Sequence, residues 1–298
     1  TTVRSDYTVP TTRYLGLKDN VALQSGDEDD LIPAHGHFPL AWMLTLTQVA
    51  TGLIIGDWIL RAFGGGGASP PLVTLIVAFA LAQAGLAGSI SHLGRPLQAW
   101  RAFLGWRRSW LSREILAFGG WAGITAAYLA SLVVGEHLYA LPKIISVLAG
   151  GAASGAGLLG VYASVQVYAD TQRRAWVFPI TAFRFFSVTA VAVCLALQAS
   201  VPAAIGMSGL LFFDLIVYGG FLPRLDQTSR LLRGPLRLPF WLRMFAGALA
   251  VGLVFLDPFA GWGALAIFFV SELIGRSLFF RSVDEWQMPG GILRKHAA

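Results

Sequence analysis

Long runs of apolar residues, separated by short polar segments, dominate the chain from residue 38 to residue 280. A helix that crosses a lipid bilayer needs about 20 mostly apolar residues. Eight runs approach or exceed this length, so the sequence predicts an all-α integral membrane protein with about eight transmembrane helices. The predicted spans cover residues 38–63, 71–92, 111–135, 141–168, 179–199, 203–222, 238–256 and 261–280.

The fourth run is unusual because it contains many small residues. Every residue from Ala149 to Gly157 is glycine, alanine or serine. Small residues let helix backbones approach closely in lipid, so we expect this helix at the centre of the bundle, in contact with protein. A flexible apolar linker is the alternative, but in lipid it would leave backbone polar groups without hydrogen bonds.

Polar segments flank the predicted bundle of residues 38–280. Residues 1–37 include Pro10, Gly16 and the acidic run 27–30, and they predict an extended arm outside the membrane. Residues 281–298 form a polar C-terminal tail. Each segment is either a solvated, mobile extension or a strap that lies across a partner subunit, and both interpretations stay open.

The basic residues are concentrated on one side of the predicted bundle. An even number of spans puts both termini on the same side, which we call side one. Of the 22 lysines and arginines, all except Arg61 and Lys143 fall on side one. The positive-inside rule then places side one, with both termini, in the cytoplasm; the alternative is a basic outer face that docks an acidic partner. The side-two loops are short, so a large partner is expected on side one.

Composition changes this picture in two ways. The chain is 55% hydrophobic and 13% charged, whereas a soluble domain is about 25% charged; the pI of about 9.8 therefore reflects membrane orientation, and no nucleic-acid partner is expected. The single Cys194 cannot hold an iron–sulfur cluster, which normally needs four cysteines.

The histidines argue against a haem and against a metal site. A haem inside a helical bundle usually needs two axial histidines, or histidine with methionine. Only His92 ends a predicted span on side one, and His137 lies on the opposite side, so no haem is expected. His35 and His37 are a weak candidate for a metal site, and none is predicted.

Two adjoining helix ends on side one carry ionisable residues. His92 ends the second predicted helix, and Glu114 lies in the first turn of the third, with Ser112 as its predicted cap. In the simplest interpretation, His92 binds a carbonyl and Glu114 pairs with Arg113 or Arg95. An ionisable group at membrane depth is, however, a functional candidate by default. A histidine and a carboxylate that converge could bind the carbonyls of a quinone and transfer its protons, assisted by Arg95 and Arg113.

Three further acidic residues lie inside predicted spans. Asp57 and Glu272 each precede an arginine by four residues (Arg61 and Arg276), so we expect an ion pair on one helix face in both cases. Asp214 has no obvious partner. Asp214 and Glu272 are our candidates for a proton path, with a structural ion pair or a neutral, hydrogen-bonded acid as the alternatives.

The sequence around these residues resembles the membrane anchor subunit of the dimethyl sulfoxide reductase family. The specific motifs are His-Leu-Gly-Arg-Pro at residues 92–96 and Ser-Trp-Leu-Ser-Arg-Glu-Ile at residues 109–115; weaker matches bring the coverage to about residues 35–285. The resemblance implies a haem-free anchor of eight helices in a bacterial cytoplasmic membrane. It also implies that menaquinone or ubiquinone binds at His92 and Glu114.

The resemblance further implies two partner subunits, a ferredoxin-like iron–sulfur subunit and a molybdopterin catalytic subunit. The anchor of such a complex exchanges electrons and protons between quinone and the nearest cluster, in anaerobic respiration with dimethyl sulfoxide, sulfite or related sulfur compounds. The long N-terminal arm departs from the short start expected of the reductase anchors, and a cytoplasmic docking side would suit the sulfite-oxidising relatives. A transporter or channel that uses the buried acids, and a purely structural anchor, are the alternatives.

Overall fold

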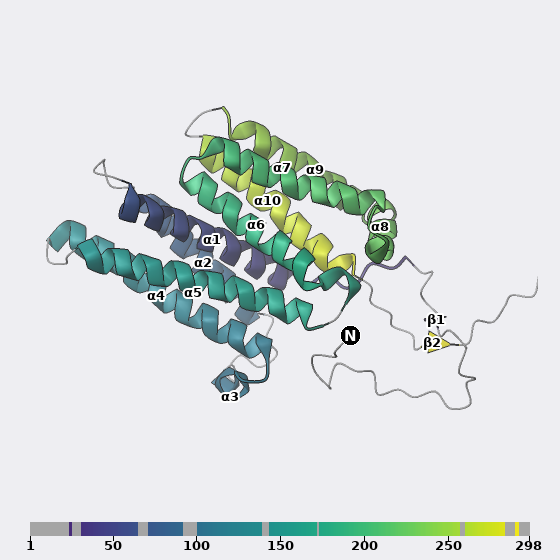
Figure 1. The fold of residues 1–298 in the computed structure, drawn as a ribbon, viewed down its shortest axis with the longest axis horizontal. Coiled ribbons are helices and arrows are strands. Elements are labelled where there is room, and N and C mark those ends of the chain that lie inside the picture. The colour runs from purple at the N-terminus through teal and green to yellow at the C-terminus, as the bar shows by residue number, and fades with distance from the viewer. Residues whose placement is uncertain are drawn as a thin grey trace, which may run out of the picture.

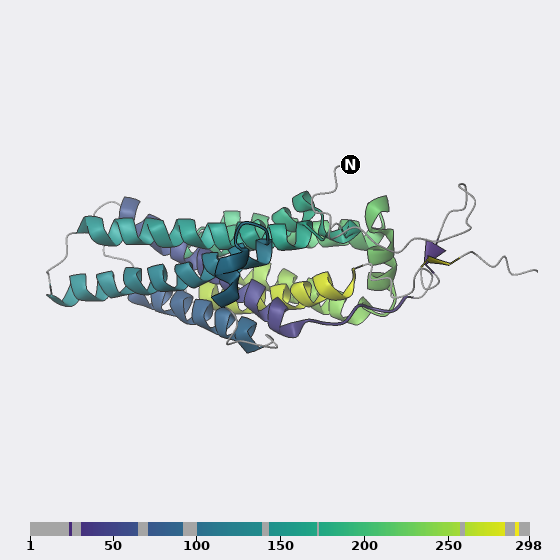
Figure 2. The ribbon, with the colours of Figure 1, turned by 90° about the horizontal axis from the view of Figure 1, so that it is seen from below.

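Long antiparallel helices make up the computed structural model, which describes residues 24–25, 31–64, 71–91, 100–138, 143–171, 173–256, 260–283 and 290–291. Within these residues, seven helices are long and apolar enough to cross a membrane. They are α1 (Phe38–Phe63), α2 (Leu72–Ser91), α4 (Trp110–Leu138), α5 (Lys143–Ala169), α6 (Phe178–Ala196), α7 (Ser200–Gly219) and α10 (Ala260–Arg281). Figure 2 shows that they run along one common axis.

The eighth predicted span corresponds to α9 (Arg237–Leu253), which follows the short helix α8 (Asp226–Arg233). With 17 residues, α9 is only about 25 Å long. The pair Pro223–Arg233 and Arg237–Leu253 is bent by 96° and counts as one candidate span, which gives seven or eight in all. The structure thus confirms a helical membrane bundle of about eight spans, but the sequence predicts no helix at α8.

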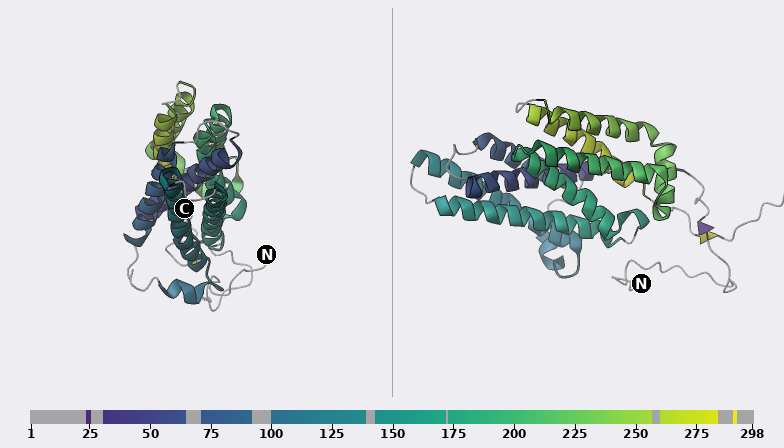
Figure 3. Two further views of the ribbon diagram at one scale, coloured as in Figure 1. Left: turned by 90° about the vertical axis from the view of Figure 1, so that its left-hand side faces the viewer. Right: turned by 45° about the horizontal axis from the view of Figure 1, so that its top comes forward.

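The central helix is α1, which packs against α2, α5, α6 and α10. The end-on view in Figure 3 shows it between the α9–α10 pair and the α4–α5 pair. In its most apolar stretch 72% of the residues are buried, against at most 56% in any other span. Its buried threonines donate to carbonyls one turn back: Thr45 to Ala41 and Thr47 to Met43, each at 2.8 Å.

The helix of small residues, α5, is in contact with protein as predicted, but it is not the central helix. Its glycines face aromatic side chains: a Cβ on Gly157 would lie 2.9 Å from Trp121 Nε1, and one on Gly160 would lie 2.5 Å from the Phe118 ring. Only 33% of its apolar stretch is buried. Small residues allow a close approach to particular neighbours, whereas a central helix needs neighbours on all sides, and α1 has them.

The two ends of the bundle differ in what they carry. Side two, at the left of Figure 1, holds the ends of α1, α4, α6 and α9 and the starts of α2, α5, α7 and α10. Side one holds α8, and there the N–H of Ala34 donates to the carbonyl of Arg281 at 3.0 Å and joins the start of α1 to the end of α10. The short elements at this side are α3 (Ala102–Gly105), η3 (Arg174–Trp176), η4 (Pro223–Leu225) and the antiparallel pair β1 (Gln24–Ser25) and β2 (Gly290–Gly291).

Candidate functional site

Four carboxylates are buried in the described part of the bundle: Asp57, Glu114, Asp214 and Glu272 are all at most 6% exposed. A buried charge is costly unless it is paired or hydrogen-bonded, so the partners of each carboxylate indicate its role. The four differ sharply in this respect.

Asp57 lies near the side-two end of α1 and is fully paired. The Nε of Arg61 is 2.9 Å from its Oδ2, and the hydroxyl of Tyr128 in α4 donates to the same oxygen at 2.7 Å. The structure therefore confirms the predicted ion pair one turn apart. The contact of Tyr128, which joins α4 to α1, is not predictable, because a tyrosine inside an apolar span gives no sign of its partner.

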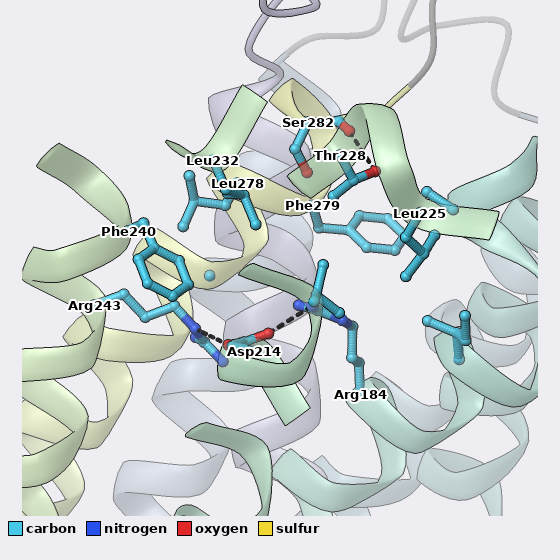
Figure 4. Close-up of a pocket in the computed structure, with 14 residues that line it drawn as sticks. Arg184, Asp214, Leu225, Thr228, Leu232, Phe240, Arg243, Leu278, Phe279 and Ser282 are labelled. Atoms are coloured by element: carbon cyan, nitrogen blue, oxygen red, sulfur yellow. Dashed lines mark hydrogen bonds and ion pairs between the residues drawn. The ribbon is translucent and has the colours of Figure 1, made fainter. Parts of the chain in front are cut away.

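Asp214, in α7, is held between two arginines from neighbouring helices. Its carboxylate oxygens lie 2.5 Å from Arg184 of α6 and 2.5 Å from Arg243 of α9, and Figure 4 shows the three side chains in line. The expectation that Asp214 has no obvious partner is therefore wrong. Both arginines lie inside predicted spans near side one, but the sequence does not show that each turns its guanidinium into the bundle toward Asp214.

Glu272 pairs with a different arginine from the one predicted. Its Oε1 is 3.0 Å from Nη1 of Arg243. Arg276, one turn further along α10, instead donates to Gln48 Oε1 at 2.5 Å and to the carbonyl of Arg184 at 3.0 Å. The predicted Glu272–Arg276 ion pair is therefore wrong.

Glu272 pairs with Arg243 instead of Arg276 because α9 and α10 approach each other closely. A Cβ on Gly275 would collide with the guanidinium of Arg243, so the glycine makes room for Arg243 beside the carboxylate of Glu272. Spacing within one helix predicts a possible pair, but it cannot show that a neighbouring helix offers a better placed cation. The proton-path roles of Asp214 and Glu272 stay predictions.

Glu114 differs from the other three carboxylates in its partner. The Ser164 hydroxyl of α5 donates to its Oε1, and no ion pair to Glu114 occurs among the described residues. Helix α4 starts at Trp110, and the Ser109 Oγ accepts from the N–H of Ser112 at 3.4 Å. Ser109 is thus the cap, in place of the predicted Ser112, and Glu114 falls in the second turn, where it can be buried against α5.

The predicted arginine and histidine neighbours of Glu114 are placed as follows. Arg113 lies over the ring of Trp110, at 4.1 Å, and donates to the carbonyls of Trp106 and Arg107 at 2.8 and 2.9 Å. Its guanidinium thus holds the turn between α3 and α4. His92 and Arg95 lie outside the described residues, in the segment 92–99 that joins α2 to α3.

Aromatic rings pack around Tyr168 at the side-one end of α5. Tyr168, one turn after Ser164 in α5, contacts the rings of Trp176, Phe279 and Phe280 at centroid distances of 5.2–5.6 Å. Tyr168 thus packs in an aromatic cluster with α10 and the segment before α6, which no local sequence motif indicates.

Rings also lie on the outer side, toward the position of lipid. The ring of Tyr162 in α5 is 5.9 Å from that of Trp110 and 6.3 Å from that of Phe178. Tyr162 and Phe178 are each 38% exposed. These rings form a partly exposed aromatic surface between α4, α5 and α6.

Cavities between the described helices adjoin two of these carboxylates, Asp214 and Asp57. The one in Figure 4 lies beside Asp214, between α6 and α10, and has a volume of about 30 Å³. That space holds one or two waters and is too small for a quinone ring. The second, of about 650 Å³, opens at side two and is lined by Asp57, Cys194, Gln198 and Trp262 among others. It lies at the opposite end of the bundle from Glu114.

Metal ligands are not grouped in the described residues: no set of three or more His, Cys, Asp or Glu there could hold a metal ion. The polar chemistry of these residues is therefore that of carboxylates, arginines and hydroxyls. Such groups bind and orient a ligand and move protons.

Comparison with known proteins identifies the family. The sequence profile of the DMSO reductase anchor subunit (DmsC) matches residues 35–216, from just before α1 to near the end of α7. The chain is also similar to a sulfite dehydrogenase subunit of Allochromatium vinosum, with 58% identity over 41 residues. This similarity is local, because it covers 14% of this chain and 13% of the relative. Since the profile spans more than half of the chain, this multi-span membrane protein belongs to the family of DMSO reductase anchor subunits.

Proposed function

We propose that this chain is the quinone-reactive membrane anchor of a molybdenum and iron–sulfur oxidoreductase. It binds menaquinone or ubiquinone at the side-one end of α2 and α4, and exchanges electrons with a ferredoxin-like iron–sulfur subunit. That subunit in turn contacts a molybdopterin catalytic subunit that acts on sulfite, dimethyl sulfoxide or a related sulfur compound. The anchor lies in a bacterial cytoplasmic membrane with side one and both termini in the cytoplasm, and it holds no haem.

One observation carries this proposal: Glu114 alone among the four buried carboxylates lacks an arginine partner in the described part of the chain. Asp57, Asp214 and Glu272 each have one within 3.0 Å, as fits a structural role. A carboxylate kept at membrane depth without such a partner is costly, and such residues mark ligand and proton sites. This argues against the interpretation of Glu114 as a helix-start carboxylate paired with Arg113.

The proposed roles follow from the chemistry of each side chain. Glu114 and His92 bind the two quinone oxygens and accept or donate their protons, since histidine titrates near neutral pH. Ser164 orients the Glu114 carboxylate through its hydrogen bond. Arg95 assists with its positive charge, and Arg113 acts by holding the loop that closes the site.

The similarity to the sulfite dehydrogenase of Allochromatium vinosum favours the sulfite-linked members of the family as the functional relatives. The basic side one suits the same assignment, because the positive-inside rule puts it in the cytoplasm and the short side-two loops leave little surface for a partner. Partner subunits would accordingly dock at α3 and the segments that flank the bundle.

The test is the oxidation of a quinol analogue by the intact complex with Glu114→Gln or His92→Ala. Loss of an acid–base group typically costs about 10²–10⁴-fold in rate, so we expect quinol turnover to fall about a hundredfold or more. The partner subunits should keep their activity with an artificial electron donor. The matched control is Asp226→Asn, at a carboxylate on α8 whose side chain is 65% exposed.

Two results would contradict the proposal. If Glu114→Gln and His92→Ala both assemble and retain the turnover of Asp226→Asn, neither residue binds quinone, and the chain is a structural anchor. If vesicles that contain this chain alone transport a solute at a rate that Glu114→Gln reduces, the protein is a transporter.

A further inference from the structure

Buried polar side chains form a row where α1, α4 and α5 meet, and we call this row the file. Among the described residues, eight buried side-chain nitrogen or oxygen atoms have no protein hydrogen-bond partner, and five of them lie on these three helices. The five side chains are at most 5% exposed. They are Gln48 and Thr51 of α1, Trp121 and Thr125 of α4, and Ser154 of α5. Gln48 accepts a hydrogen bond from Arg276 of α10, so the other four side chains form the file.

The buried face of α5 shows the order of these groups through the bundle. The Ser164 hydroxyl meets Glu114 near side one. Two turns on, a Cβ on Gly157 would lie 2.9 Å from both Thr51 Oγ1 and Trp121 Nε1, so these atoms face the same place. Ser154 follows one turn later on the same buried face.

The file ends near side two at the ionic cluster of Asp57. A Cβ on Gly150 would lie 2.8 Å from Cζ of Tyr128, whose hydroxyl donates to Asp57. Thr125 lies one turn before Tyr128 in α4 and is fully buried. Asp57 is also among the residues that line the side-two cavity of about 650 Å³, so the end of the file adjoins a space large enough for many waters.

Such a row of groups has a recognised physical consequence. Buried polar atoms are nearly always satisfied, by protein or by internal water, because a group without a hydrogen bond keeps the full cost of its desolvation. Hydroxyl and indole groups that follow one another through an apolar bundle therefore favour a row of internal waters. Waters and hydroxyls in sequence transfer protons.

We propose that α1, α4 and α5 enclose a proton path of hydroxyls and single internal waters from the Glu114 end of the bundle to Asp57 and side two. The inference rests on the proposed function, since the protons are those of the quinone reaction. Oxidation of a quinol yields the quinone, two electrons that leave through the iron–sulfur partner, and two protons. The path carries these protons to side two, opposite the partner subunits, and carries them back when the quinone is reduced.

Phe118 separates the two parts of the path. Its ring lies against Gly160, between the level of Glu114 and that of Trp121, and is 2% exposed. The ring must turn aside for water to connect the two parts. The ring thus limits proton leakage when no quinone reacts.

The experiment uses the whole complex in liposomes, with side one outward and a pH-sensitive dye inside. Ferricyanide outside accepts the electrons from the partner subunits, and the rate in protein-free liposomes is subtracted. Because ferricyanide takes up no protons, both quinol protons are released either inside or outside. We expect acidification of the interior, which a protonophore abolishes.

Matched variants assign this acidification to the file. Thr125→Val removes a hydroxyl at nearly constant volume, and with Ser154→Ala it should reduce interior acidification per quinol oxidised about tenfold, a factor typical of lost hydrogen bonds. Thr125→Ser, which keeps the hydroxyl, should retain the normal interior acidification. The control is Thr181→Val, because Thr181 of α6 is also buried and unpartnered but lies outside the file.

Two results would overturn the path and leave the quinone site standing. One is acidification of the exterior alone during normal turnover. The other is equal interior acidification in the double variant Thr125→Val with Ser154→Ala and in the control Thr181→Val. Absence of quinol oxidation in the wild type would refute the proposed function, and the path with it.

A second measurement needs no turnover. Hydroxyl-radical footprinting of the full chain should label Trp121 from internal water and spare Phe268, a buried ring of the same core cluster that lies outside the file; an unlabelled Trp121 refutes the path.

Discussion

Replacing Arg243 with methionine should destabilise the bundle more than any other single loss of charge in the described helices. Arg243 is 1% exposed and lies 2.5 Å from Asp214 and 3.0 Å from Glu272. It also donates to the Ser271 carbonyl at 2.9 Å. Removal of one partner from a buried ion pair costs about 3–5 kcal/mol, because the remaining charge is left without compensation.

The structure also predicts which second substitution restores stability. Asp214 keeps Arg184 at 2.5 Å when Arg243 is lost, whereas Glu272 loses its only ion-pair partner in the described residues. Glu272→Gln in the Arg243→Met background should therefore recover more than half of the loss. Asp214→Asn should recover less, because it would leave Arg184 unpaired in turn.

The assay is equilibrium unfolding of the purified chain in mixed micelles with increasing sodium dodecyl sulfate. Reaction of a dye with the single Cys194, which is partly buried in α6, provides an independent readout. Arg237→Met is the matched control: it changes an exposed arginine of the same helix, and we expect a change within about 0.5 kcal/mol. A loss below about 1 kcal/mol for Arg243→Met, or better rescue by Asp214→Asn, would refute this account.

Two further predictions concern packing and hydrogen bonding. Gly275→Ala should cost about 1–3 kcal/mol in the same unfolding assay, because the new Cβ meets the Arg243 guanidinium; Gly120→Ala, which meets nothing within 4 Å, should be neutral, and equal effects would contradict the contact. Tyr128→Phe should cost about 1.5–3 kcal/mol, since it removes the 2.7 Å hydrogen bond to the Asp57 side chain, which is paired with Arg61; an unchanged unfolding midpoint would show that Asp57 does not depend on it.

The spans could be predicted from the sequence because the bilayer requires a minimum length of apolar residues. Most predicted ends agree with the structure within about three residues; α1, at residues 38–63, agrees at both ends. Helix α8 escapes such a prediction because it is short and polar, and only the structure shows that Leu231 and Leu232 are buried there. A hydropathy argument identifies helices that meet lipid and not those that lie across the end of a bundle.

The site was predictable in its residue types and less so in its contacts. The sequence identified Glu114 as a candidate at a helix end but left its burial open, whereas the pair of Asp57 with Arg61 followed from spacing on one helix. The partners of Asp214 and Glu272 did not follow, because Arg243 reaches both from another helix. Rotation of each helix about its axis decides such contacts, and a single sequence with little amphipathic pattern leaves that rotation undetermined.

The central position of α1 has a consequence for the order of assembly in the cell. Helix α1 is synthesised before the other described spans. Its Gln48 therefore lacks its hydrogen-bond donor Arg276 until that residue is synthesised, 228 residues later. At about 5–20 residues per second, this delay is on the order of ten to fifty seconds. Asp57 has its counter-charge on the same helix, in Arg61, so its charge is already balanced when α1 first enters the lipid. The later helices can then condense around α1 as each leaves the ribosome, and α10 closes the bundle last.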